Sequence, residues 1–167
     1  HDDEHRKWSD LAVFYRTNAQ SRVLEESLTH GGVPYKVVGG TKFYDRREIK
    51  DALAYLRLAS NPLDEVSIKR VLNVPKRGIG DATETQLASY AERNGISVRQ
   101  ALAFVDDLGF GPKITGAIKR LGELLDEFSA IIETEPVDLL LKGVLEKSGY
   151  LDVLKASRDP QDEARVE

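Results

Sequence analysis

From about residue 40 onward, apolar residues recur at intervals of three and four, which is the spacing of one face of an α-helix. Such a stripe folds as an amphipathic helix that buries its apolar face against other helices. This pattern confines the chain to helix-on-helix packing, so we predict a mainly α fold in which residues 39–167 form a multi-helix unit with helical hairpins. The longest stripe consists of Ile114, Ile118, Leu121, Leu125, Phe128 and Ile132.

Shorter stripes predict the other helices of this unit. Asp81 with Glu84, and Ser97 with Gln100, have the spacing of a capping box, in which two residues satisfy each other's free amides at a helix start. Pro136 stands where the first turn of another helix is expected. The apolar sets on these helices are Ile49, Ala52, Leu53 and Leu56; Ile68, Val71 and Leu72; Leu87, Tyr90 and Ala91; Ala101, Leu102 and Val105; and Leu140, Leu141, Val144 and Leu145.

The first 38 residues have a different pattern. Leu11–Tyr15 and Tyr35–Val38 are short apolar runs rich in β-forming residues, which predicts two buried strands. Between them, Asn18 has the chemistry of a helix cap. Strand, helix and strand make up part of an α/β layer, but 38 residues are too few to complete one. We therefore predict a truncated β-α-β piece in residues 1–38, with Gly39-Gly40 as the hinge to the helical unit.

Composition excludes several classes of protein. The absence of cysteine excludes disulfides, thiolate metal sites and cysteine nucleophiles. No apolar run approaches the roughly 18 residues of a membrane span, and no basic-then-apolar leader opens the chain, so we expect a cytoplasmic setting. Methionine is absent, even at position 1, so we expect a piece of a larger protein to which the function belongs.

The net charge of −4 is unevenly distributed. Residues 1–56 are neutral overall, residues 57–120 carry +3 and residues 121–167 carry −7. A pI near 5.5 argues against a protein that coats nucleic acid. The basic middle section still allows a local phosphate contact, which needs only a few cations and backbone donors. The acidic last third is most simply a solvated helical surface.

Two junctions between predicted helices share the pattern Gly-apolar-Gly. They are Gly78-Ile79-Gly80 and Gly109-Phe110-Gly111. In each, the glycines allow a sharp turn, the middle residue is expected in the core, and the next helix presents unpaired amides at its N-terminus. Such amides are suited to a phosphate oxygen and bind a DNA backbone without reading bases. Either hairpin alone is more often a plain tight turn.

The first hairpin is the better candidate for a phosphate site. Lys76 and Arg77 precede it, and Thr83 supplies a hydroxyl in the first turn of the next helix. Asp81 beside it opposes phosphate binding, although it also suits a helix cap. In the second hairpin, Asp106-Asp107 would repel phosphate.

Motifs for catalysis are absent from the sequence. There is no G-x-x-x-x-G-K-[ST] phosphate loop, no H-E-x-x-H and no G-x-S-x-G. The three histidines lack metal-ligand spacing. The Asp64-Glu65 pair is expected to begin a helix, where negative charge suits the dipole. We therefore predict no catalytic residue, metal site or cofactor site within this chain.

Three sequence blocks stand in order along the chain. They run from Leu11 to Glu26 (LAVFYRTNAQSRVLEE), from Gly39 to Arg57 (GGTKFYDRREIKDALAYLR) and from Asn73 to Gly80 (NVPKRGIG). With the later Lys147-Ser148-Gly149-Tyr150, they closely resemble the UvrD/PcrA/Rep group of superfamily 1 DNA helicases over nearly the whole chain. The resemblance implies that residues 1–38 are part of motor domain 2A, and that residues 39–167 are most of the inserted helical subdomain 2B.

The resemblance also implies an activity for the parent protein. It would be an ATP-dependent 3′-to-5′ DNA helicase of repair or replication that uses ATP and Mg²⁺, with 2B as the duplex-contacting and regulatory arm. Because the phosphate loop and the other motor motifs are missing here, this chain alone is not expected to hydrolyse ATP. The implied partners are single-strand/duplex DNA junctions, the remaining helicase domains, and repair or transcription proteins. The implied location is the bacterial cytoplasm, at the nucleoid, with no membrane contact.

Family position implies roles for individual residues. Arg16 and Asn18 would contact the single-strand backbone, although from spacing alone they are a solvated charge and a helix cap. Lys50 and Arg57, two turns apart on one helix face, would follow the duplex backbone or else be ordinary surface charge. The expected duplex-phosphate contacts are Lys76, Arg77, Gly78, Ile79, Gly80 and Thr83.

Two other functions compete with the duplex-binding arm. In the first, the acidic helices of residues 121–167 dock a partner protein and DNA contact is slight. In the second, the chain is a free-standing DNA-binding protein built on two helical hairpins. Affinity for duplex that falls steeply with salt would favour a phosphate contact over a protein-docking platform.

Overall fold

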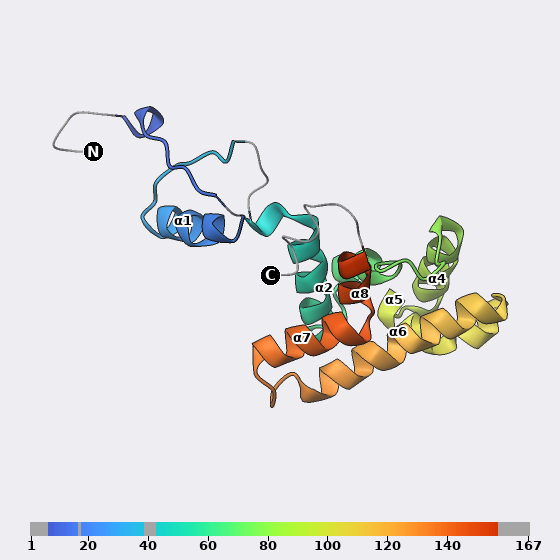
Figure 1. Cartoon of the computed structure of the whole chain (residues 1–167). Helices are drawn as coiled ribbons and strands as arrows, with labels where there is room; N and C mark the ends of the chain where they lie inside the picture. The colour runs from blue at the N-terminus through green and yellow to red at the C-terminus, as the bar shows by residue number, and fades with distance from the viewer. Residues whose placement is uncertain (1–6, 17, 39–42, 157–167) are drawn as a thin grey trace. The chain divides into compact units, whose positions relative to one another are not determined.

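The computed structural model of the chain describes residues 7–16, 18–38 and 43–156. Helices make up the secondary structure of these residues, with η denoting a 3₁₀-helix (Figure 1). The elements in chain order are η1 Trp8–Asp10, α1 Asn18–His30, η2 Phe43–Asp45, α2 Arg47–Ser60, α3 Glu65–Val71, α4 Asp81–Asn94, α5 Val98–Ala101, η3 Leu102–Leu108, α6 Pro112–Ile131, α7 Val137–Lys147 and α8 Tyr150–Ala156.

The described residues form two compact units. Unit 1 comprises those up to Lys50, which include η1, α1, η2 and the start of α2. Unit 2 begins at Asp51, within α2, and holds α3 to α8. No strand occurs in the described ranges, and the mainly α fold is confirmed. Across the same ranges, no helix is both long and apolar enough to cross a membrane.

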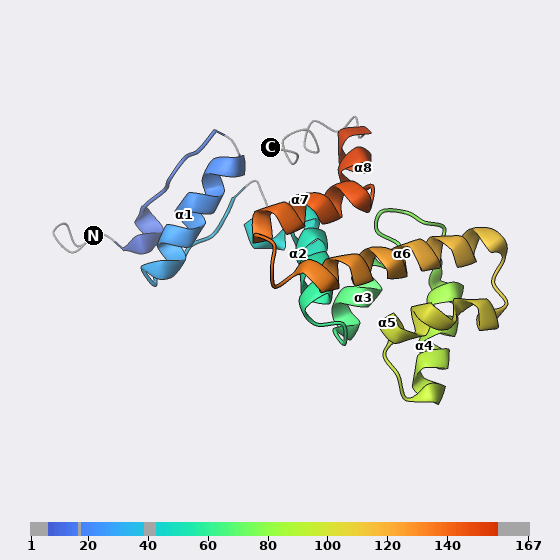
Figure 2. The same cartoon turned by 90° about the horizontal axis from the view of Figure 1, so that it is seen from below.

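Unit 2 is built around α6. Ile118, Leu121 and Leu125 are almost fully buried there, so the predicted apolar stripe is confirmed. Figures 1 and 2 show α4 towards the start of α6 and α7 beside its end, and Arg99 of α5 pairs with Asp126 in the second half of α6 at 2.7 Å. Helix α7 approaches closely because Gly143 has no side chain: a Cβ there would lie 3.2 Å from the Phe128 ring. The core is completed by Leu58 of α2, Val71 of α3, Leu87 of α4, Leu102 of η3 and Val144 of α7.

The two predicted capping boxes have different outcomes. Ser97 and Gln100 cap α5 reciprocally, as predicted. The box of Asp81 and Glu84 is wrong, because the N-cap of α4 is Gly80 and Asp81 is already the first helical residue. Gly80 is extended, with φ −97° and ψ 177°, and makes no side-chain cap. The helix therefore starts one residue later than the box requires.

The two predicted strands of residues 1–38 do not form. Residues 11–15 and 35–38 are irregular, and their apolar side chains stay largely in solvent, with Phe14 93% exposed. A strand is stable only when its backbone pairs with a neighbour and one of its faces is covered. The helix between them, α1, forms as predicted. Gly39-Gly40, the predicted hinge, lies outside the described residues, and the boundary after residue 38 stays a prediction.

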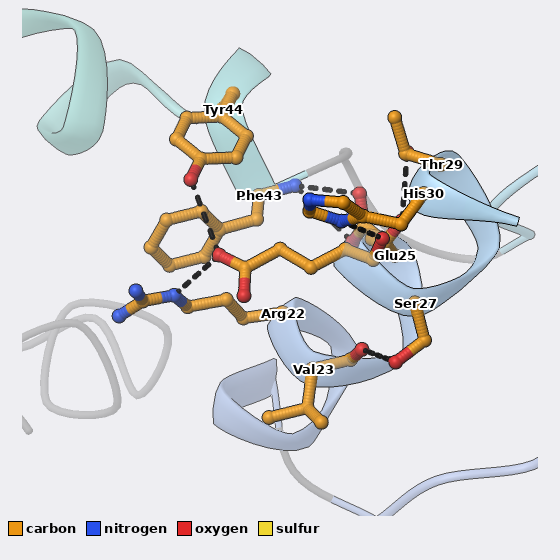
Figure 3. Close-up of polar contacts among 9 residues, drawn as sticks. Arg22, Val23, Glu25, Ser27, Thr29, His30, Phe43 and Tyr44 are labelled. Atoms are coloured by element: carbon orange, nitrogen blue, oxygen red, sulfur yellow. Dashed lines mark hydrogen bonds and ion pairs between the residues drawn. The ribbon is translucent and has the colours of Figure 1, made fainter.

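Polar contacts hold α1 to η2 in unit 1 (Figure 3). Glu25 is 7% exposed, and its two carboxylate oxygens accept the Phe43 amide at 3.2 and 3.1 Å. Glu26 accepts from Arg22 Nε at 2.9 Å and from the Tyr44 hydroxyl at 3.2 Å. Every buried apolar side chain in the described ranges belongs to unit 2. Unit 1 therefore lacks an apolar core of its own within those ranges.

Candidate nucleic-acid interface

The segment between α3 and α4 is a loop organised by one side chain. Asn73 Oδ1 accepts hydrogen bonds from two backbone amides, those of Arg77 at 2.8 Å and Ile79 at 3.3 Å. Ile79 is 2% exposed and belongs to the core of unit 2, as predicted. Gly78, between these two amides, has φ +80°, a conformation that disfavours any residue with a Cβ. The loop therefore turns sharply at Gly78 with its neighbours fixed.

The Arg77 side chain points into the unit rather than out to solvent. Its Nη1 donates to the carbonyls of Val71 at 2.8 Å and Pro75 at 3.2 Å, and its Nη2 donates to the Tyr55 hydroxyl at 2.6 Å. The Tyr55 hydroxyl in turn donates to the carbonyl of Val74. The Arg77 guanidinium thus donates to three acceptors within the protein and helps to fix the conformation of the loop. Only its remaining N–H groups are left to bind a phosphate.

The start of α4 presents free backbone donors to solvent. Gly80 caps the helix, and its carbonyl accepts the amides of Thr83 and Glu84, both at 3.0 Å. Within the described part of the chain, the amides of Gly80, Asp81 and Ala82 have no acceptor, and all three residues are exposed. Thr83 is 7% exposed and lies in the same turn. Free amides at a helix N-terminus attract an anion, whereas the exposed Asp81 carboxylate opposes one.

The two glycines of this loop differ in whether their backbone conformation requires glycine. A Cβ on Gly78 or on Gly80 would meet no atom within 4 Å. Gly78 requires glycine because of its positive φ, but the φ of −97° at Gly80 suits any residue. As the N-cap of α4, however, position 80 favours glycine over alanine. Its open side lies next to the free amides, where an incoming ligand would benefit from the missing side chain.

The second Gly-apolar-Gly hairpin has the same backbone design. Gly109 has φ +69°, and Gly111 is the N-cap of α6. It offers fewer donors, because the first helical residue is Pro112, which has no amide hydrogen. Asp106 in the preceding segment adds an exposed carboxylate. The two hairpins therefore share a positive-φ glycine and a glycine N-cap, and the ranking of the first above the second as a phosphate site stays a prediction.

The other predicted contact residues are divided between the two units. Arg16 is exposed just before α1, and its amide donates to Gln20 Oε1 at 3.0 Å. Asn18 is the first residue of α1, and its side chain lies outside the described set. Lys50 forms an exposed ion pair with Asp45 at 3.0 Å. These residues belong to unit 1.

Two more cations of the prediction lie in unit 2. Arg57 is exposed in the last turn of α2, and Lys76 is exposed beside a groove of about 540 Å³. The groove has mixed charge, because Glu123 and Glu127 line it and Glu127 pairs with Lys147. A uniformly basic path for DNA is therefore not present in the groove. Its lining residues are Pro75, Lys76, Arg77, Ala117, Arg120, Leu121, Glu123, Leu124, Glu127, Lys147 and Ser148.

Two residues that organise the loop were absent from the predicted set. The role of Asn73 is predictable from the sequence, since asparagine before a glycine turn commonly accepts nearby backbone amides. The role of Tyr55 is not predictable in this way, because its partners lie 19 and 22 positions away in the sequence. The predicted apolar face of α2 also placed Leu53 and Leu56 in the core, where they are only half-buried, while Tyr55 is fully buried.

The chain belongs to the family of the UvrD-like helicase C-terminal domain, which its residues 1–106 match. This match confirms the resemblance inferred from the three sequence blocks. Relatives of known identity include the proteins described as ATP-dependent DNA helicase PcrA from Bacillus subtilis, 45% identical, Staphylococcus epidermidis, 42%, and Staphylococcus aureus, 41%. Each comparison covers all 167 residues of this chain but only 23% of the relative.

Proposed function

We propose that this chain is the duplex-binding arm of an ATP-dependent 3′-to-5′ DNA helicase, and that the loop Gly78–Gly80 with the start of α4 contacts the duplex backbone. The observation that carries the proposal is the exposed Gly80, with open space where a Cβ would stand and free amides beside it. The names of the relatives support a helicase as the parent protein.

The chemistry of such a contact is independent of sequence. Backbone amides donate to phosphate oxygens and carry no information about the bases. Lys76 adds an exposed charge, whereas Thr83 lies in the same turn but is only 7% exposed. Arg77 contributes through the shape of the loop. Lys50 and Arg57 are proposed as further duplex contacts.

Several properties of the parent protein belong to the same proposal. Arg16 and Asn18 are proposed to contact the single strand. The partners proposed are a junction of single-strand and duplex DNA, the remaining helicase domains, and proteins of repair or transcription. We place the helicase at the nucleoid in the bacterial cytoplasm.

ATP and Mg²⁺ are assigned to the rest of the parent protein. The sequence lacks a phosphate loop, and in the described ranges no three histidine, aspartate or glutamate side chains gather where they would hold a metal ion. The described residues therefore provide no such metal site, and the sequence provides no phosphate loop for the nucleotide. We assign no step of ATP hydrolysis to this chain.

The test is a matched pair of substitutions, Gly80→Ala and Gly111→Ala. Both positions are N-caps with negative φ, and neither Cβ would meet a protein atom within 4 Å. Both changes replace a glycine N-cap with the poorer cap alanine, so we expect similar and small decreases in the thermal unfolding midpoint. Gly80→Ala should weaken duplex binding about tenfold, because charge-assisted amide–phosphate bonds are each worth ~1.5–3 kcal/mol. Gly111→Ala should bind like the unsubstituted chain.

Binding is measured by fluorescence anisotropy over a salt series, with a duplex that ends in a 3′ single strand. The log–log salt slope should stay close to that of the unsubstituted chain in both variants, because a neutral amide releases no counterion, whereas each lysine or arginine contact contributes about 0.9. Equal affinities for Gly80→Ala and Gly111→Ala would show that this loop is not the contact. Binding that does not vary with salt would favour the protein-docking alternative.

A further inference from the structure

Helix α2 carries two buried polar side chains one turn apart. Asp51 is 2% exposed, and Tyr55 is fully buried. Asp51 accepts from Arg70 Nε of α3 at 2.7 Å and from the Tyr150 hydroxyl of α8 at 2.8 Å. These two bonds hold α2 against α3 and α8, and neither of them involves the candidate loop.

Tyr55 makes the corresponding contacts to the loop itself. Its hydroxyl accepts from Arg77 Nη2 and donates to the carbonyl of Val74. Burial raises the pKa of the Tyr55 phenol, although Arg77 partly opposes this rise. The phenol thus keeps its proton at neutral pH and remains a donor. Both ends of the loop segment before Gly78 are therefore tied to one hydroxyl group.

The position of the free amides depends on these bonds. Arg77 is held at its amide by Asn73 and at its guanidinium by Tyr55. Without the Tyr55 hydroxyl, the Arg77 guanidinium and the Val74 carbonyl each lose a partner, and the segment is held by fewer bonds, those of Arg77 Nη1 and of Asn73. Tyr55 has no exposed surface with which to touch DNA.

We propose that Tyr55 is a positioning residue for duplex binding, acting through Arg77 and Val74 on the loop Gly78–Gly80. This inference rests on the proposed function of that loop. Tyr55 sets the geometry of the amides and makes no contact with the phosphates. The role belongs to the hydroxyl group, because the ring alone would suffice to fill the core.

The experiment compares Tyr55→Phe with Tyr150→Phe in the full chain. Both changes remove one buried phenol hydroxyl that bonds within unit 2 and leave the ring in place. We expect similar decreases in thermal midpoint for the two variants. Tyr55→Phe should raise the duplex Kd about three- to tenfold, and Tyr150→Phe should leave it within a factor of two. Equal Kd values for the two variants would overturn the inference.

A second variant, Arg77→Lys, separates geometry from charge and also serves if Tyr55→Phe fails to fold. Lysine keeps the positive charge but lacks the planar fork that reaches Tyr55 and two carbonyls together. We expect a loss of affinity as large as that of Tyr55→Phe. Affinity equal to that of the unsubstituted chain would overturn the inference. The proposed function has a separate test, because it would be contradicted by a Gly80→Ala variant that binds duplex as well as the unsubstituted chain.

Amide hydrogen exchange gives a readout that general destabilisation does not move. In Tyr55→Phe, the amides of Arg77 and Ile79 should exchange faster relative to the amides of α6. In Tyr150→Phe, exchange at these two amides should change only in proportion to α6. A proportional change in both variants would assign Tyr55 to stability alone and overturn the inference.

Discussion

At the scale of single residues, the conformation of the loop between α3 and α4 depends on a few polar groups that each form more than one hydrogen bond. One oxygen of Asn73 accepts two amides on either side of Gly78. Each of those amides would otherwise need water or another acceptor inside a tight turn. The Asn73 side chain thus supplies the acceptor that a helix or strand backbone would otherwise provide. Removing it leaves two amide donors without this partner.

Asn73→Ala should therefore lower the free energy of unfolding by about 1–3 kcal/mol, the cost of leaving buried donors without a partner. The same variant should bind duplex more weakly, because the loop loses its fixed shape. Chemical denaturation and anisotropy titration measure the two effects. Asn73→Asp keeps an acceptor at the same place and should recover most of the stability. Equal stabilities of the alanine and aspartate variants would contradict the role given to the Asn73 oxygen.

Gly78 shows a different kind of dependence. Its φ of +80° is costly for a residue with a Cβ, while the space around it is open. Gly78→Ala should therefore destabilise the chain by about 1–2 kcal/mol through backbone strain alone. Gly80→Ala has negative φ and equally open space, so it loses only the preference for glycine over alanine at an N-cap and should cost less, about 0.5 kcal/mol. Denaturant midpoints measure the difference, and equal midpoints would show that the turn relaxes without strain.

At the scale of elements, sequence reasoning succeeded where the information is local. The stripe along α6 and the reciprocal cap of Ser97 and Gln100 depend on residues three or four apart, and both were predicted. The strands at Leu11–Tyr15 and Tyr35–Val38 failed because a strand needs a neighbour that a local pattern does not supply. The bond between Tyr55 and Arg77 was inaccessible for a similar reason, since it joins α2 to a loop 22 positions later.

The start of α3 gives a prediction about pH. Asp64 caps this helix by accepting the amides of Ser67 at 3.0 Å and Val66 at 3.1 Å. These bonds, with the Ser67 hydroxyl, lower the pKa of the Asp64 carboxyl below its usual value. A lowered pKa in the folded state gives stability that is present above the unfolded pKa of about 3.9 and is lost as pH falls through the folded pKa.

Asp64→Asn tests this contribution, because asparagine caps a helix about as well as aspartate but does not titrate. Thermal midpoints of both proteins are measured from pH 6 downward, and the difference between the two curves isolates Asp64 from the other carboxyl groups. The advantage of the aspartate should be constant at neutral pH and shrink below about pH 4. Parallel curves over the whole range would show that the cap contributes no pH dependence.

At the scale of the whole molecule, the two units differ in what stabilises them. Unit 2 has a continuous apolar core that includes residues from α2 to α7. In unit 1, the buried residues of the described ranges are Ser21, Glu25 and Glu48, all polar. Hydrogen bonds add little net stability when water competes for the same groups, whereas apolar burial contributes about 25 cal/mol per Å². The units should therefore have very different local stabilities.

Amide hydrogen exchange on the full chain should show this difference directly. Helices α1 and α7 are suitable for comparison, because they are of similar length and, among the side chains that the structure describes, only α7 buries apolar ones, Leu140 and Val144. A local stability lower by ~3 kcal/mol makes exchange more than about a hundredfold faster, and we expect α1 to differ from α7 by at least that factor. The exposed Val13, Phe14 and Val23 add no protection, because they meet solvent instead of a sheet. Protection of α1 equal to that of α7 would mean that polar contacts such as Glu25 with Phe43 stabilise unit 1 as well as a core does.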